Sequence, residues 1–540
     1  MKIKSLLIGM LACTALVGCT DDDVVENNET LEKGKAYVAV DIKTFNPSSR
    51  TASDYYEDGI EAENAVTNAR FYFFNSNGTA WSANSQGTNY VEASLSLSNK
   101  TDDDIASGET TRPGNIEKES AAVLVIQNNT GTLPQSIVAV LNAPTYLDNT
   151  SKSLTELKAA IGNIEQIGTT TSGNFVMTNS VYKNKLNEVA TEVMLAPENI
   201  CDNDGTGEQN GALDHPVSIY VERVVAKVRL QGPTSTNKLA TGSTFTPVDS
   251  DTETAIYAKI NGWGIANNVN NSYLFKNINT SWDDTRLGFT WNDIPYFRSY
   301  WATTATTAAN TNANSWGDLN DFNDKYCFEN TSSSLLPTEV LVSATLVDQN
   351  ENAIEIAEWF TQQYTVTGLK AKVAESLNQK LFTKNGTTLT AIPTEAIDFV
   401  ATNETDEQNG YESYEAKAII ASTYKNTKWH NIDGTELTDA QVNEIMATVQ
   451  PAKIWKSGQT YYRAKIRHLA NDSESQGYYG VVRNHLYKIQ VTGVSGLGTP
   501  VYNPDKIIIP TDDDSDKSFV AAQIYILSWR VVANDNVTLQ

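Results

Sequence analysis

The sequence predicts an all-β protein built from two β-sandwich domains with a few short helices. Short runs in which apolar and polar residues alternate recur along the chain, and Gly, Asn, Ser or Pro residues bound them. Charged residues make up only 19% of the chain, whereas Tyr and Trp number 24 and 10. This low share of charged residues, together with the many Tyr and Trp residues, is typical of an exported, β-rich protein.

The first residues read as a lipoprotein signal. Lys2 and Lys4 form a charged start, and the apolar run that follows is too short to span a bilayer. The run ends in Leu-Val-Gly-Cys at residues 16–19, so we expect removal of residues 1–18 and lipidation of Cys19. The alternative is an ordinary secretory signal with an incidental cysteine. The acidic run at residues 20–23 resembles signals that send such lipoproteins to the outer face of the outer membrane, and residues 24–34 are expected to be a flexible tether.

The stretch Ala36–Arg50 combines a strand with a candidate cut site. Val38, Val40 and Ile42 share one face, as expected for a half-buried strand. Turn-forming residues follow and end at Arg50, where a trypsin-like protease could cut before Thr51. The plainer alternative is a first β-strand followed by a surface loop.

The residues after Thr51 predict a first domain over 51–232. Alternation predicts strands at 69–74, 91–97, 122–127, 137–142 and 174–178, and one long strand over 215–228 with a polar break at its Glu-Arg pair. Ser153 and Glu156 form a capping box for a helix in which Ile161 shares the apolar face and Gly162 closes the end. A segment rich in Gly, Thr, Ser and Asn, residues 231–244, marks the boundary.

A second domain is predicted over 233–530. Its clearest strands are 255–265, 339–347, 461–468, 484–491 and a run within 519–532. Helical spacing of Leu369, Val373, Leu377 and Leu381 predicts one helix, and Thr438 with Gln441 caps another over 439–446.

Charge and residue inventory argue against several functions. A net charge of −25 disfavours nucleic-acid binding. The four histidines, His215, His430, His468 and His485, have no second His or Cys at metal-ligand spacing, and His485 is expected to be structural. We therefore expect no metal, no cofactor and no enzymatic activity, with a surface glycan-processing enzyme kept as a third hypothesis. Cys201 and Cys327 could form a disulfide, although they lie in different predicted domains.

Several stretches together resemble the fimbrilins of Bacteroidales type V pili. They are the Leu-Val-Gly-Cys lipobox at residues 16–19, the leader that ends at Arg50, and the segments 175–180, 219–223, 261–263, 327–331, 479–487 and 529–532. The resemblance implies a lipoprotein precursor with two transthyretin-like β-sandwich domains. It also implies that an arginine-specific, trypsin-like protease removes the leader with its first strand, and that a neighbour's C-terminal strand fills the vacated groove.

The C-terminal residues supply the candidate donor strand. Alternation over 531–540 points to Val531, Val532, Val537 and Leu539 as the donor residues, in preference to an earlier segment. The resemblance then implies a shaft subunit that polymerises with copies of itself and with anchor and tip subunits. It is expected in the outer membrane through the lipid on Cys19 and then in a cell-surface fimbrium, where it supports adhesion, biofilm formation or colonisation. The alternative is a tip or accessory adhesin that binds a host protein or glycan.

Overall fold

The computed structural model describes residues 34–45, 59–95, 98–99, 116–128, 132–163, 175–183, 189–202, 215–232, 238–245, 253–278, 302–304, 319, 321–331, 337–402, 415–468, 478–501, 519–527 and 531–532. Two compact units divide the chain. The first is Met1–Val224 with Tyr273–Asn277, and the second is Val225–Ser272 with Ile278–Gln540. The division between residues 224 and 225 lies ahead of the position 232/233 expected from the sequence.

The first unit is built mainly from strands. Its elements are β1 (Gly34–Phe45), α1 (Glu61–Asn64), β2 (Ala69–Phe74), β3 (Tyr90–Ala93), β4 (Ser98–Asn99), β5 (Ile116–Asn128), β6 (Ser136–Leu141), α2 (Leu154–Ala159), β7 (Ile161–Asn163), β8 (Met177–Asn179), β9 (Tyr182–Lys183), β10 (Val189–Ala190), β11 (Val193–Met194), η2 (Pro197–Asn199), β12 (Ile200–Asp202) and β13 (Val217–Arg223).

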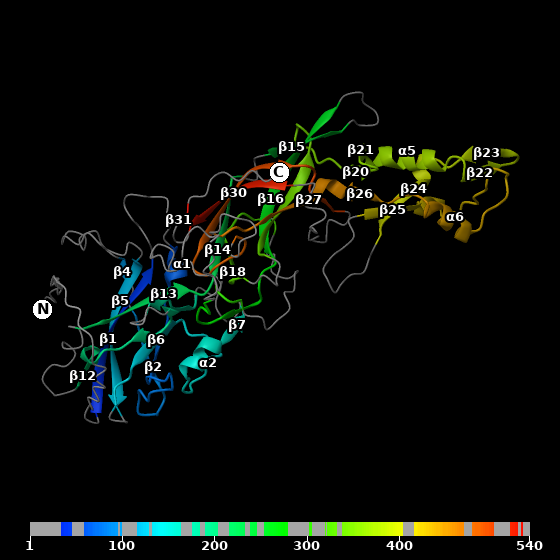
Figure 1. The fold of residues 1–540 in the computed structure, drawn as a ribbon. Helices are drawn as coiled ribbons and strands as arrows, with labels where there is room; N and C mark the ends of the chain where they lie inside the picture. The colour runs from blue at the N-terminus through cyan, green and yellow to red at the C-terminus, as the bar shows by residue number, and fades with distance from the viewer. Residues whose placement is uncertain are drawn as a thin grey trace, which may run out of the picture. The chain divides into compact units, whose positions relative to one another are not determined.

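Within the described part of this unit, ten strands form one sheet in the order β3-β2-β6-β8-β13-β1-β5-β4, with β11 beside β6 and β12 beside β1 (Figure 1). One apolar core serves strands from both ends of this order, since Phe71 of β2 and Leu124 of β5 belong to the same buried cluster. The sheet therefore curls around its own core, and β1 lies in its interior rather than at an edge.

The second unit has more elements. They are β14 (Ala226–Gln231), β15 (Lys238–Phe245), β16 (Thr254–Ala266), β17 (Asn271–Tyr273), β18 (Lys325–Cys327), β19 (Glu339–Val347), β20 (Ile356–Trp359), β21 (Gln362–Thr365), α5 (Val366–Leu377), β22 (Phe382–Asn385), β23 (Thr388–Ala391), η5 (Thr394–Ala396), β24 (Ile397–Ala401), β25 (Glu415–Ile420), η6 (Ser422–Tyr424), α6 (Asp439–Met446), β26 (Ala452–Trp455), η7 (Lys456–Gly458), β27 (Gln459–Lys465), β28 (Leu486–Ser495), β29 (Thr499–Pro500), β30 (Phe519–Leu527) and β31 (Val531–Val532). The last residue of β17 belongs to the first unit.

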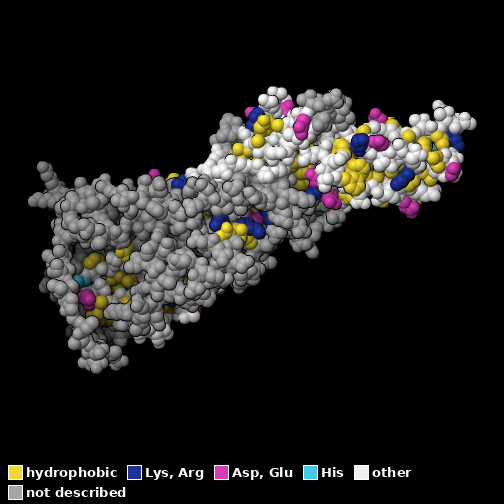
Figure 2. All heavy atoms as spheres, turned by 45° about the horizontal axis from the view of Figure 1, so that its top comes forward, with side chains coloured by type: hydrophobic (Ala, Val, Ile, Leu, Met, Phe, Trp, Pro, Cys, Tyr) yellow, Lys and Arg dark blue, Asp and Glu magenta, His cyan; other side chains and the backbone are white. Residues whose placement is uncertain are grey.

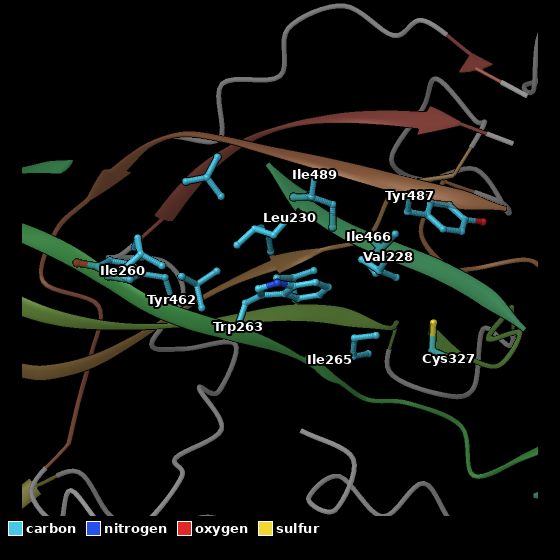
Figure 3. Close-up of a cluster of buried hydrophobic side chains, with 14 of the residues drawn as sticks. Val228, Leu230, Ile260, Trp263, Ile265, Cys327, Tyr462, Ile466, Tyr487 and Ile489 are labelled. Carbon is cyan, nitrogen blue, oxygen red and sulfur yellow. The ribbon is translucent and has the colours of Figure 1, made fainter. Parts of the chain in front are cut away.

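Two sheets of the second unit form a β-sandwich. Their orders over the described strands are β18-β14-β28-β30-β31 and β15-β16-β19-β27-β29. Residues from both sheets share one buried cluster, in which Trp263 of β16 lies among Val228 of β14, Ile489 of β28 and Tyr462 of β27 (Figure 3). The predicted all-β class with a few short helices is confirmed.

An inserted module interrupts the sandwich between β19 and β27. Its own sheet has the order β21-β20-β26-β25-β24, and helices α5 and α6 share a separate core with it. Ile356 of β20 pairs with Trp455 of β26, so the chain enters and leaves the module through adjacent antiparallel strands. The sequence indicated both helices but not the module.

Two local expectations are wrong. The single strand over 215–228 is two strands, because Val224 N donates to Val176 O (3.1 Å) in the first unit whereas Lys227 N donates to His485 O (2.8 Å) in the second. Gly162 does not close helix α2: the helix ends at Ala159 and Ala160 is already extended, so Ile161 and Gly162 lie in β7. The capping box of Ser153 and Glu156 is confirmed.

Candidate functional site: the slot that holds strand β1

Strand β1 is paired along both of its edges. On one edge it runs antiparallel to β5, in continuous register from Gly34 opposite Asn128 to Thr44 opposite Lys118. On the other edge its first half pairs with β12, from Ala36 to Val38, and its second half runs parallel to β13, from Val40 to Thr44. The backbone groups of β1 thus belong to a central strand of the sheet.

The side chains in the middle of β1 are buried on both faces. Val38 and Val40 are 0% exposed and belong to the core of the first unit, and Ala39 between them is also buried. A strand that alternates apolar and polar residues is expected to be buried on one face only. The expectation of a half-buried strand is therefore too weak for residues 38–40, because Ala39, on the opposite face from Val38 and Val40, is buried as well.

The neighbouring strands form the walls of a slot around β1. Opposite Val38 lie Leu124 and Ile200, and opposite Val40 lie Ala122 and Val217. Ile42 lies in register with Ile219, which is fully buried. Residues in register on neighbouring strands share a face of the sheet. We call the paired edges of β5, β12 and β13, with the side chains Ala122, Leu124, Ile200, Val217 and Ile219, the β1 slot.

Sequence reasoning did not identify the wall residues. The alternation of Ala122, Leu124 and Ile126, and of Val217, Ile219 and Val221, signals buried strand faces. That signal does not say which strands are neighbours, because the parallel pairing of β1 with β13 joins residues far apart in the chain. The structure supplies this information.

The predicted processing residues Cys19, Arg50 and Thr51 lie outside the described residues. Arg70, the next arginine along the chain, lies in β2 and is buried. Its Nη2 donates to Glu92 Oε1 (2.7 Å) and its Nη1 to Leu147 O (2.9 Å). These bonds make Arg70 a structural residue that a protease could not reach without unfolding β2.

The candidate donor begins in a short strand of the chain's own sandwich. Val531 and Val532 form β31, and they pair with Leu527 and Ile526 of β30. Val537 and Leu539 lie outside the described residues. Strand β31 lies at the end of its sheet's strand order, so among the described strands it is at an edge of the sheet.

Two of the stretches that carry the resemblance meet in the second sandwich. Glu329 and Arg483 are both buried, and the guanidinium Nε and Nη2 lie 2.8 Å from Glu329 Oε2. Arg483 N also donates to Glu329 Oε1 (3.2 Å). Removal of one partner from a buried charge pair of this kind strongly destabilises the protein. The two stretches therefore hold the fold together.

The residues around Arg483 are structural as well. His485 Nδ1 lies 2.8 Å from Arg483 O, which agrees with the structural role expected for this histidine. Tyr487 Oη accepts a hydrogen bond from Val482 N (2.8 Å) and lies 2.9 Å from His468 Nδ1. Burial raises the pKa of Tyr487 well above its usual value, so its hydroxyl stays protonated.

The C-terminal part of the chain matches a known family. Residues 453–535 match the family described as "Major fimbrial subunit protein type IV, Fimbrillin, C-terminal". The resemblance to fimbrillins is confirmed. The fimbrillin segment runs from β26 past β31, and so contains β28, the buried Arg483 and the edge strand β31.

Solved structures of a cell adhesion protein and of two fimbrial proteins align with much of the chain at low identity. A putative cell adhesion protein from Parabacteroides distasonis is 14% identical, with a TM-score of 0.38, over 91% of this chain and 96% of that chain. A fimbrilin from Porphyromonas gingivalis is 13% identical, with a TM-score of 0.33, over 93% and 99%. The C-terminally truncated tip fimbrial protein Mfa3 from Porphyromonas gingivalis is 10% identical, with a TM-score of 0.29, over 91% and 99%. No curated protein matches.

The remaining side-chain chemistry of this fimbrillin-like chain offers little besides the slot. Across the described ranges, no three His, Cys, Asp or Glu residues gather where they could hold a metal ion. Of the helices in the same ranges, none is both long and apolar enough to cross a membrane. Cys327 is a free, buried thiol of the second sandwich.

Proposed function

We propose that the chain is a shaft subunit of a surface fimbria that polymerises by protease-triggered donor-strand exchange. Cys19 anchors the precursor in the outer membrane by its lipid. An arginine-specific, trypsin-like protease cuts between Arg50 and Thr51, so that the leader with β1 can be exchanged for a donor strand. The 531–540 segment of a neighbouring copy then fills the β1 slot, and anchor and tip subunits complete a fimbrium that supports adhesion, biofilm formation or colonisation.

The observation that supports this proposal most is the interior position of β1. A strand at the N-terminus of a chain, upstream of a candidate cut site, completes a sheet from within. Burial of Val38 and Val40 stabilises the unit by about 1.5–3 kcal/mol each, apart from backbone pairing. A strand that replaces β1 would gain comparable energy, because an open sheet edge binds any extended segment of suitable pattern.

The family match agrees with this role. The matched family is described as that of a major fimbrial subunit. The segment that contains the candidate donor, β31, lies inside the matched residues. Strand β31 is held to its own sheet on the β30 side, and such a short edge strand can be peeled away at low cost.

The experiment compares the full-length precursor with its Arg50→Ala and Arg50→Lys variants. After treatment with an arginine-specific protease, the unaltered chain should start at Thr51 and form ladders that resist mild heating in detergent. Both variants should stay monomeric. With trypsin, which also cuts after lysine, the Arg50→Lys variant should recover polymerisation. Ladders that form unchanged in Arg50→Ala would refute the proposal.

A second candidate function is a tip or accessory adhesin, and one feature of the inserted module favours it. Phe360 and Thr361 join β20 to β21 with φ values of 51° and 65°, a turn that normally takes Asn or Gly. Such backbone strain costs of order 1–3 kcal/mol per residue and is kept mostly at functional sites. Phe360 is 65% exposed, and its ring lies 4.8 Å from that of Trp359.

This turn would present an aromatic surface to a host protein or glycan. Hydrophobic side chains lie among Lys, Arg, Asp and Glu side chains on the surface shown in Figure 2. Deletion of residues 531–540 separates the two functions. A shaft subunit should stop polymerising, whereas a tip subunit should still be incorporated.

A further inference from the structure

We propose that cleavage leaves the leader strand bound in the β1 slot, and that its displacement by a donor strand sets the rate of polymerisation. This inference rests on the proposed function. It adds a bound intermediate, in which the cut leader is a non-covalent ligand of its own subunit.

The cut site lies outside the paired region of β1. The paired region of β1 ends at Phe45, so cleavage after Arg50 breaks a peptide bond beyond it. The pairing with β5, β12 and β13 is the same before and after this cut. Every hydrogen bond and apolar contact that holds β1 in the intact chain therefore still holds it in the cut chain.

An empty β1 slot would leave the sheet of the first unit divided. In the strand order, β1 is the link between β13 on one side and β5 with β4 on the other. Loss of β1 would divide the sheet there and leave unpaired backbone edges on both sides. It would also uncover Leu124 and Ile219, which are buried in the intact unit. Unpaired backbone groups and bare apolar side chains are each costly, so the empty slot is a high-energy state.

The kinetic consequence follows from these two arguments. A strand paired on both edges leaves only when most of that pairing is lost, and so its spontaneous dissociation is slow. A donor strand that replaces the pairing step by step avoids the empty state. Polymerisation should therefore depend on the stability of β1 in the slot even after cleavage is complete.

The experiment uses the full chain, cut at nanomolar concentration so that subunits do not meet. Gel filtration under native conditions followed by mass spectrometry then asks whether the leader fragment elutes with the body that starts at Thr51. We expect the two fragments to elute together. When the sample is concentrated, free leader should appear at the same rate as the ladders form. Leader lost at once from a folded, monomeric body would overturn the inference.

A pair of valine variants tests the rate. Val40→Ala weakens β1 in its slot without altering the walls, so the cut chain should release leader and polymerise about tenfold faster. Val373→Ala, in the separate core of the inserted module, is the matched control and should polymerise at the unaltered rate. Equal rates for Val40→Ala and the unaltered chain would overturn the inference, and the dilution experiment decides independently if Val40→Ala does not fold.

Different results would refute the proposed function and the bound intermediate. Ladders whose subunits still contain the uncut leader would refute the proposed function itself. Cut subunits that polymerise normally after instant loss of the leader would refute only the bound intermediate.

Discussion

Removal of the Glu329 carboxylate should destabilise the second unit strongly. In Glu329→Ala the guanidinium of Arg483, which is 0% exposed, keeps the hydrogen bond from Nη2 to Ser272 Oγ (3.3 Å) but loses the charge of Glu329. Breaking a buried pair in this way costs about 3–5 kcal/mol. That is a large part of the 5–15 kcal/mol typical of a folded protein.

Amide hydrogen exchange followed by mass spectrometry measures this effect within one unit. The loss should lower the protection of peptides from β28 by roughly 100-fold to 4,000-fold. Peptides from β2, in the first unit, serve as an internal control and should keep their protection. The double variant Glu329→Gln/Arg483→Met removes both charges while an acceptor remains for Arg483 N, so it should recover much of the loss. Unchanged protection of β28 in Glu329→Ala would refute the reasoning.

Two further predictions concern titration in the second unit. Burial alone would raise the pKa of Asp324, but hydrogen bonds from Arg229 and the charge of Lys227 outweigh burial and hold that pKa below 3.8. The contribution of Asp324 to the free energy of unfolding should therefore be full above pH 3.8 and lost as the pH falls through the folded-state pKa. Asp324→Asn should weaken this loss of stability at acid pH, as urea titrations at a series of pH values would measure. An unchanged loss would contradict the assignment. Burial raises the pKa of Cys327 to about 12. Iodoacetamide at pH 8 should therefore leave this thiol unlabelled in the folded chain and label it in urea, as peptide mapping would report. Labelling of the folded chain would show that the site opens.

Elements with strong local signals were predictable from the sequence. Strands β2 and β19 have the expected bounds, and β1 extends the expected strand at both ends. Helix α6 begins where its capping box places it, with Thr438 N donating to Gln441 Oε1 (2.9 Å). Such signals lie within a few residues of one another, so a single sequence contains them in full.

Features that depend on distant pairing were not predictable. The run 217–231 is apolar across Val224 and Val225, and nothing local says that its two halves join different sheets. The inserted module depends on the pairing of Ile356 with Trp455. The walls of the β1 slot depend likewise on the register of β1 with β13. In each case alternation indicates a strand but does not identify the strand's partner.

The inserted module attaches to the sandwich through one pair of neighbouring strands, β20 and β26, and it has a core of its own. Chain segments with this kind of attachment tolerate replacement, because their two ends are already close together. In a fibre of such subunits, the β1 slot and the donor strand would join one copy to the next. The inserted module would be separate from both, so its surface could change while the joints stay the same. Variants could then exchange the module, and with it what the fibre presents to its surroundings, while copies that carry different modules still assemble into one filament.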